Sequence, residues 1–284
     1  MSNYHIHADA HMGRVQLKVS QLERSITFYT EVIGLKLLSQ GEGHAELGVE
    51  GSGVLLGIEE IAQARILRPQ SVTGLYHFAI LLPNREELGT TLLHLAHTGI
   101  EIGQGDHLVS EAFYLNDPDG NGIEIYADRP RSQWQKDAKG EYVMATDPVD
   151  VDSLLKLAGE WQGLPTGTII GHVHLHVGNL PEARKFYVDG LGFDVVLHFG
   201  GGALFVSAGG YHHHMGLNTW AGVGAPAAPA DAVGLQYFTL VYPNGEELDR
   251  AVMALENAGF AVTDTPEGPS ALDPFGNRAV LTVE

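Results

Sequence analysis

The chain contains no cysteine. A disulfide framework and a thiolate metal site are therefore excluded, and a cytoplasmic location is the default expectation for such a sequence. Basic residues are also scarce, because 16 Lys and Arg stand against 35 Asp and Glu and give a formal net charge of −19. This excess of negative charge would repel a phosphate backbone, so we exclude nucleic acid as a partner.

Long apolar runs are missing as well. No stretch approaches the roughly 18 consecutive apolar residues that a membrane-spanning helix needs, so we expect no membrane association. The N-terminal segment "MSNYHIHADAH" lacks the basic start and apolar centre of a secretory signal peptide. The chain does have 44% hydrophobic residues, enough for an ordinary core, and 15 histidines, which no globular fold requires as such.

Two long segments of the chain recur at a nearly constant offset. Residues 13–38 align without a gap with residues 171–196, and residues 74–102 align in the same way with residues 234–262. An Asp-Pro-x-Gly-Asn turn, starting at Asp117 in one copy, follows the second pair of segments in both halves. Such self-similarity indicates a repeated structural unit.

Each repeat predicts the same local structure. A strand with alternating apolar residues is followed by a helix with apolar residues at helical spacing, such as Leu88, Leu92 and Leu95, and Gly99 ends that helix. Short strands complete the unit. The sequence therefore predicts an α+β fold of four βαβββ modules, paired in twos into two curved half-barrel sheets around clefts. The expected modules span residues 12–60, 73–128, 169–221 and 233–284.

In chain order the modules group into two domains separated by a linker. The N-terminal domain is expected at 1–128, the linker at 129–168 and the C-terminal domain at 169–284. We expect one helix in the linker, at about 150–159, with Asp150 or Asp152 as its N-cap.

Two equivalent positions distinguish the four modules. The position early in the first strand holds, in module order, Arg14, His77, His172 and Tyr237, and the position assigned to the last strand holds Leu55, Glu124, His213 and Val280. Two imidazoles and one carboxylate form the facial triad that binds non-haem Fe(II) with open coordination positions. We therefore predict that modules two and three pair to build a metal site, and that modules one and four pair into a metal-free copy.

Two structural alternatives compete with a metal site. A single strand histidine is more often hydrogen-bonded than a ligand, and Glu124 could form a salt bridge with a Lys or Arg. The metal site is favoured because Glu124 lies between Ile123 and Ile125 in an apolar strand, where an unpaired carboxylate is costly.

The modules and several short segments of this sequence resemble those of a known superfamily. The modules, together with the segments "YHFAI", "DHLVSEAFYLNDPDGNGIEIYADRP" and "GHVHLHV", resemble the vicinal oxygen chelate superfamily over essentially the whole chain. Within it, the segments "SVTGLYHFAILLP" and "GGYHHHMGLNTW" are similar to those of type I extradiol dioxygenases of the Bacillus-type catechol-2,3-dioxygenase group. The resemblance implies an enzyme that opens a small aromatic diol with O2 at Fe(II), with Mn(II) also suited to the ligand set.

By position, the resemblance implies residue roles. It makes His77, His172 and Glu124 the metal ligands and His213 the acid–base histidine. Tyr114 matches a tyrosine that hydrogen-bonds a substrate oxygen, and His107 is a weaker candidate for a supporting histidine because its spacing differs. The remaining expected pocket residues are Phe205, Asn218 and Trp220, together with His174 and His176. The last two could line the pocket, support the ligands, or be packed polar residues.

Two further expectations concern the surroundings of this site. His212 and His214 are expected to point away from His213 and to be structural. In the better-known enzymes of this kind the active pair is modules three and four, whereas here Tyr237 and Val280 have replaced the ligands of module four.

Other functions stay open at this point. A glyoxalase-like isomerase would want a second glutamate where His213 stands, and a non-enzymatic resistance protein that binds a small molecule would need no triad. A hydroquinone-cleaving dioxygenase would use the same iron site and differ only in pocket shape. Unpaired module edges are compatible with a homo-oligomer.

Overall fold

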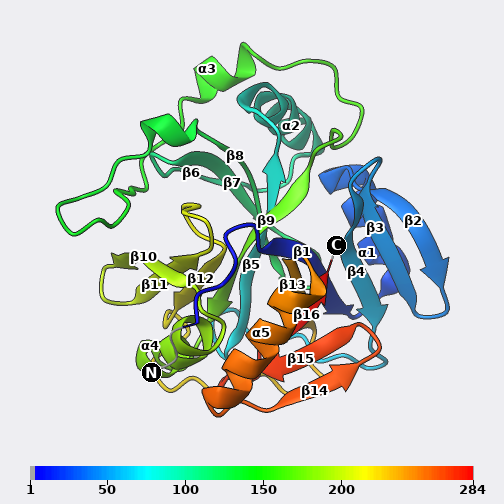
Figure 1. The fold of residues 1–284 in the computed structure, drawn as a ribbon. Coiled ribbons are helices and arrows are strands. Elements are labelled where there is room, and N and C mark those ends of the chain that lie inside the picture. The colour runs from blue at the N-terminus through cyan, green and yellow to red at the C-terminus, as the bar shows by residue number, and fades with distance from the viewer. Residues whose placement is uncertain (1–3, 284) are drawn as a thin grey trace.

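The computed structural model describes residues 4–283 and arranges sixteen strands in two eight-stranded sheets (Figure 1). The first sheet has, in spatial order, β14 (Val262–Thr265), β15 (Gly268–Leu272), β16 (Arg278–Val283), β13 (Gly234–Tyr242), β1 (His11–Val19), β4 (Gly53–Glu60), β3 (His44–Val49) and β2 (Lys36–Gly41). The second has β10 (Asp194–Phe199), β11 (Ala203–Ser207), β12 (Met215–Asn218), β9 (Ile169–His176), β5 (Gly74–Leu82), β8 (Gly122–Asp128), β7 (Ser110–Asn116) and β6 (Gly103–Asp106).

The strand order confirms the predicted pairing of modules. β1 pairs antiparallel with β13, and β5 pairs antiparallel with β9. Modules one and four thus share the first sheet, and modules two and three share the second. Each sheet takes one module from each half of the chain, so the division into 1–128 and 169–284 describes the order of modules and not the sheets.

Helices pack on the sheets, and helices that belong to different sheets contact one another. They are α1 (Leu22–Thr27) continuing into the π-helix η1 (Phe28–Ile33), α2 (Arg85–Thr98), the 3-10 turn η2 (Arg131–Gln133), α3 (Val151–Leu155), α4 (Leu180–Arg184) continuing into the π-helix η3 (Lys185–Gly190), and α5 (Gly245–Asn257). As predicted, α2 ends at Gly99, which has a φ of 72°. Its N-cap Asn84 accepts a hydrogen bond from the Glu87 backbone, and Asn244 caps α5 in the same way.

The linker helix is shorter than expected. Asp150 is the N-cap, as one of the two alternatives proposed, but α3 ends at Leu155 instead of continuing to residue 159. The chain then packs onto α2: the Gly159 N–H donates to the Thr90 hydroxyl, and the Leu157 N–H donates to the Leu154 carbonyl in a tighter turn. These bonds replace the helical ones that the sequence pattern predicted.

The two sheets are joined through the Asp-Pro turns. The Tyr29 hydroxyl in module one donates to Asp117 in module two at 2.8 Å, and Tyr187 in module three donates to Asp273 in module four at 3.0 Å. All four groups are buried. The repeated sequence thus produces two equivalent cross-links between the sheets, beside the shared hydrophobic core.

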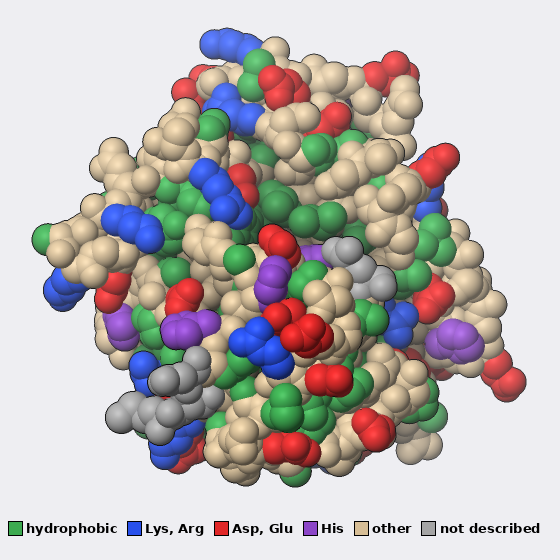
Figure 2. All heavy atoms as spheres, viewed as in Figure 1, with side chains coloured by type: hydrophobic (Ala, Val, Ile, Leu, Met, Phe, Trp, Pro, Cys, Tyr) green, Lys and Arg blue, Asp and Glu red, His purple; other side chains and the backbone are tan. Residues whose placement is uncertain are grey.

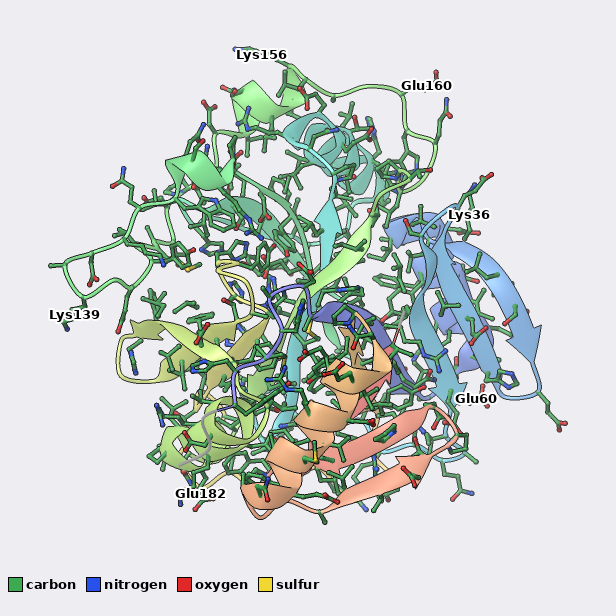
Figure 3. All side chains as sticks on the ribbon, in the orientation of Figure 1. Lys36, Glu60, Lys139, Lys156, Glu160 and Glu182 are labelled. Atoms are coloured by element: carbon green, nitrogen blue, oxygen red, sulfur yellow. The ribbon has the colours of Figure 1, made fainter. Side chains whose placement is uncertain are left out.

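The linker lies along the second sheet and closes its open side. Asp147 forms a bridge with Asp106 of β6, and the Tyr142 N–H donates to Val196 of β10. The linker's outer loop, at Lys139, and the end of α3, at Lys156, lie on the periphery (Figure 3). On the face shown in Figure 2, Lys and Arg side chains are scattered among Asp and Glu. Among the described residues, no helix is long and apolar enough to cross a membrane.

Candidate metal centre

Three adjacent strands in the middle of the second sheet bring the predicted ligands together. Ala79 of β5 is the register partner of both Glu124 on β8 and His172 on β9, so these side chains leave the sheet on the same face. His77 lies two residues before Ala79 and shares that face. The ligand atoms of His77, Glu124 and His172 all lie within 4.8 Å of one another, and all three residues are buried.

The donor atoms point to a common centre. Glu124 Oε2 lies 3.0 Å from His77 Nε2 and 3.1 Å from His172 Nε2. Only the second contact has hydrogen-bond geometry, so His77 Nε2 is a buried nitrogen without a hydrogen-bond partner. Buried nitrogens normally have a partner, and two imidazole nitrogens with a carboxylate oxygen fit a divalent ion. Among the described residues no Lys or Arg pairs with Glu124, so the salt-bridge alternative is not met.

The protonation states also suit a cation. Burial opposes ionisation of Glu124, but the adjacent His172 and His77 outweigh it and hold the pKa of the carboxyl well below its usual range. Burial lowers the pKa of His77, against the opposing effect of Glu124. An ionised Glu124 and a neutral His77 are the forms in which these two groups bind a metal ion.

A cavity of about 400 Å³ opens on this cluster. The sequence-predicted residues that line it are His77, His107, Tyr114, Glu124, His174, Phe205, His213 and Trp220. Burial lowers the pKa of His174 well below its usual range, so its imidazole lines the cavity in the neutral form. The linker supplies part of the wall through Met144, Ala145 and Thr146. Sequence reasoning missed these three residues because the linker has no counterpart among the repeats.

The expectation that His176 and Asn218 contact substrate needs correction. Neither side chain lines the cavity. The two residues are register partners on β9 and β12, and His176 Nδ1 lies 2.6 Å from Asn218 Oδ1. The same oxygen accepts from the Trp220 backbone N–H. The pair therefore fixes the backbone position of Trp220, which does line the cavity.

His107 and Tyr114 form a linked pair at the cavity. His107 Nδ1 lies 2.7 Å from the Ala145 carbonyl, and Nε2 lies 2.6 Å from the Tyr114 hydroxyl. A carbonyl can only accept, so His107 Nδ1 carries a proton, and Nε2 shares the second hydrogen bond with the Tyr114 hydroxyl. Burial, and then the nearby Glu124 charge, raise the pKa of Tyr114 well above its usual range. Tyr114 therefore keeps its proton.

His213 reaches the cavity from a turn and not from a strand. It precedes β12, and its ring centroid lies 4.1 Å from that of His172 and 4.9 Å from that of Phe205. Because the backbone is not extended here, the two-residue alternation of side chains fails. His212, expected to point away, instead places its Nδ1 2.8 Å from His213 Nδ1. His214 does turn away and accepts the Ala208 N–H.

The equivalent position in the first sheet holds a guanidinium. Arg14 donates to Glu46 at 3.0 Å and to the Tyr237 hydroxyl at 2.6 Å. The strand register corrects the last-strand equivalence: Glu124 corresponds to Gly57 on β4, not to Leu55, and to Val280 on β16, so this cleft offers no triad. Among residues 4–283, the cluster of His77, Glu124 and His172 is the one group suited to a metal ion.

Paired βαβββ modules around a buried cluster of two histidines and a glutamate define a metal-binding enzyme fold of the glyoxalase and dioxygenase type. The chain belongs to the Glyoxalase/Bleomycin resistance protein/Dioxygenase superfamily, whose family model matches residues 11–125 and 169–281.

Individual relatives support this membership. The chain is 54% identical over 281 residues to a catechol-2,3-dioxygenase of Bacillus subtilis (strain 168), covering 98% of this chain and 99% of the relative. A solved structure from Bacillus subtilis subsp. subtilis str. 168 superposes with a TM-score of 0.64 at 12% identity, over 98% of this chain and 86% of that one. Glyoxalase I from Zea mays gives a TM-score of 0.56 at 18% identity, over 96% and 92%. At these identities the two structures show the fold alone.

Proposed function

We propose that the protein is an extradiol dioxygenase that opens the ring of a catechol with O2 at Fe(II), giving a 2-hydroxymuconate semialdehyde-type product. The observation that carries the proposal is the buried cluster of His77, Glu124 and His172 beside a cavity, in a chain 54% identical to a catechol-2,3-dioxygenase. Mn(II) suits the same donors, so the metal itself belongs to the proposal.

The three side chains would hold the ion on one face and leave its other positions toward the cavity. When bound, Fe(II) supplies a redox-active Lewis acid that can accept both a diol and O2. Ala79 leaves room for the ion by its small size. It lies between Glu124 and His172, and a larger side chain there would fill the space where their donor atoms converge.

His213 is the proposed base for a diol hydroxyl. Burial, and then the neighbouring His172, lower its pKa well below the usual range, so the imidazole is neutral and can accept a proton. His213 passes the proton taken from the diol hydroxyl to the ring-opened product, since its lowered pKa favours release. Tyr114, which keeps its own proton, orients a substrate oxygen, and His107 fixes the position of Tyr114 through the Ala145 carbonyl.

The cavity walls fit an aromatic ring. Phe205, Trp220 and Met144 give the cavity apolar wall area, and the rings of Phe205 and Trp220 lie beside those of His213 and His174. A volume of about 400 Å³ lies toward the small end of ligand pockets, which suits a single-ring diol. Small aromatic diols and O2 are therefore the proposed partners. A cytoplasmic location and a homo-oligomer stay predictions from the sequence.

The isomerase alternative is disfavoured by the cavity lining. A glyoxalase-like reaction would want a second carboxylate to move a carbon-bound proton, and Glu124 is the one carboxylate among the described lining residues. The position it would need holds His213.

The test is ring cleavage by metal-loaded protein. Protein loaded with Fe(II) without oxygen is mixed with catechol or hydroquinone and then exposed to air. We expect a yellow product absorption with catechol, none with protein carrying Glu124→Gln, and normal activity with the control Glu46→Gln in the metal-free sheet. Turnover of hydroquinone alone would replace the catechol assignment, and no turnover of any diol would overturn the proposal.

A further inference from the structure

A chain of hydrogen bonds leads from the cavity away from the metal cluster. His213 Nδ1 lies 2.8 Å from His212 Nδ1, and His212 Nε2 lies 2.8 Å from Asp128 Oδ1. Asp128 is the last residue of β8, the strand that also carries Glu124. One strand thus places one carboxylate at the metal cluster and another behind the histidine pair.

The direction of these bonds follows from what each group can donate. The Asp128 carboxylate can only accept, so His212 Nε2 carries a proton. With both rings in the neutral form, His212 Nδ1 is the acceptor and His213 donates from Nδ1. This arrangement leaves His213 Nε2 as the nitrogen with the free electron pair. No hydrogen bond reaches His213 Nε2 among the described residues, and the ring lines the cavity.

Packing fixes the orientation of the His212 ring. The residue is fully buried, and its ring centroid lies 4.1 Å from that of Tyr211 and 5.1 Å from that of Trp134. The Tyr211 hydroxyl also donates to Asp128, at 3.3 Å, which keeps the carboxylate directed inward. These contacts oppose a turn of the ring that would exchange its two nitrogens.

The histidine pair has no counterpart in module one. The strand register makes Met215 the counterpart of Leu56, so His212 and His213 correspond to Gly53 and Val54 of module one, in the sheet where the described residues hold no metal cluster. The histidine pair therefore occurs only where the metal ligands occur. A purely structural polar pair would have no reason to follow the ligands.

We propose that His212 and Asp128 are positioning residues that fix His213 in the tautomer with Nδ1 protonated and Nε2 free to act as the base. This rests on the proposed role of His213 in ring cleavage. The arrangement is comparable to the histidine and aspartate of a serine protease, where loss of the orienting carboxylate places the proton on the wrong nitrogen.

The test compares two substitutions of nearly equal shape. His212→Asn keeps an acceptor close to the position of Nδ1, whereas His212→Leu removes it. We expect His212→Leu to lower kcat on the order of 100-fold with little change in KM, and His212→Asn to retain about tenfold more activity than Leu. Iron content and thermal unfolding of both variants serve as controls.

The second readout does not depend on activity. Nitrogen-15 NMR of the metal-free protein reports which nitrogen of each histidine carries the proton, and the His213 signals are assigned by their loss in His213→Gln. We expect Nδ1-protonated His213 in the wild type and in His212→Asn, and a mixture or the Nε2-protonated form in His212→Leu.

The outcomes separate the two proposals. If the wild type opens no diol, the proposed function fails while the NMR result still tests the tautomer. If the wild type is active but the Asn and Leu variants have equal kcat, or His213 has the same tautomer in both, the positioning role is overturned.

Discussion

His214 gives a stability prediction whose size follows from the structure. It faces away from the cavity, near Tyr211 and Phe193, and its Nδ1 accepts the Ala208 N–H at 3.1 Å. Burial, and then the neighbouring His212 and His172, lower the pKa of His214 from 6.5 to about 3. The folded protein therefore holds this imidazole neutral over a pH range in which the unfolded chain would protonate it.

The lowered pKa of His214 makes the folded protein less stable at acidic pH. Above pH 6.5 neither state binds the proton, and stability is unaffected. Between pH 6.5 and about 3 only the unfolded chain binds it, so the free energy of unfolding falls as the pH falls. For this single group, integrating from pH 7 to pH 5 gives a loss of about 2 kcal/mol.

Urea unfolding of the metal-free protein at pH 7 and pH 5 measures this loss. Burial also lowers the pKa of other histidines, so the wild type is compared with His214→Asn, which keeps an acceptor for the Ala208 N–H but does not titrate. We expect the wild type to lose about 2 kcal/mol more than the variant over this interval. Equal losses in the two proteins would show that His214 is not held neutral and would refute the reasoning.

Two further predictions concern catalysis and the core. Tyr114→Phe removes the hydroxyl that orients substrate, so steady-state kinetics should show kcat lower by about 100-fold with iron content unchanged; an unchanged kcat would remove Tyr114 from the mechanism. Leu88→Ala, in the fully buried face of α2, should lower the free energy of urea unfolding by roughly 2–5 kcal/mol without changing KM; a loss below about 1 kcal/mol would contradict the packing described.

The repeats made most of the fold predictable. Self-similarity fixed the module order, and the distribution of ligand-type residues selected the pairing of module two with module three. That pairing could be inferred because His77 and Glu124 lie in one module while His172 lies in another. Periodicity alone would have fitted either arrangement of the modules.

The surroundings of the site were less predictable, for physical reasons. His213 was assigned to a strand because its position in the repeat is a strand position elsewhere, yet here the backbone turns before β12. The contact between His212 and His213 follows from that turn. Met144 reaches the cavity because the linker folds back across the second sheet, and no local pattern encodes that path. The roles assigned to His107, Tyr114 and His213 stay predictions.

The most direct test of the account is an anaerobic Fe(II) titration of the purified protein, followed by equilibrium dialysis and iron analysis. The wild type and the control Glu46→Gln should each retain one iron per chain, and Glu124→Gln should bind it on the order of 100-fold more weakly or not at all, because the carboxylate ligand is lost. Equal iron binding by wild type and Glu124→Gln would contradict the claim that His77, Glu124 and His172 hold one ion.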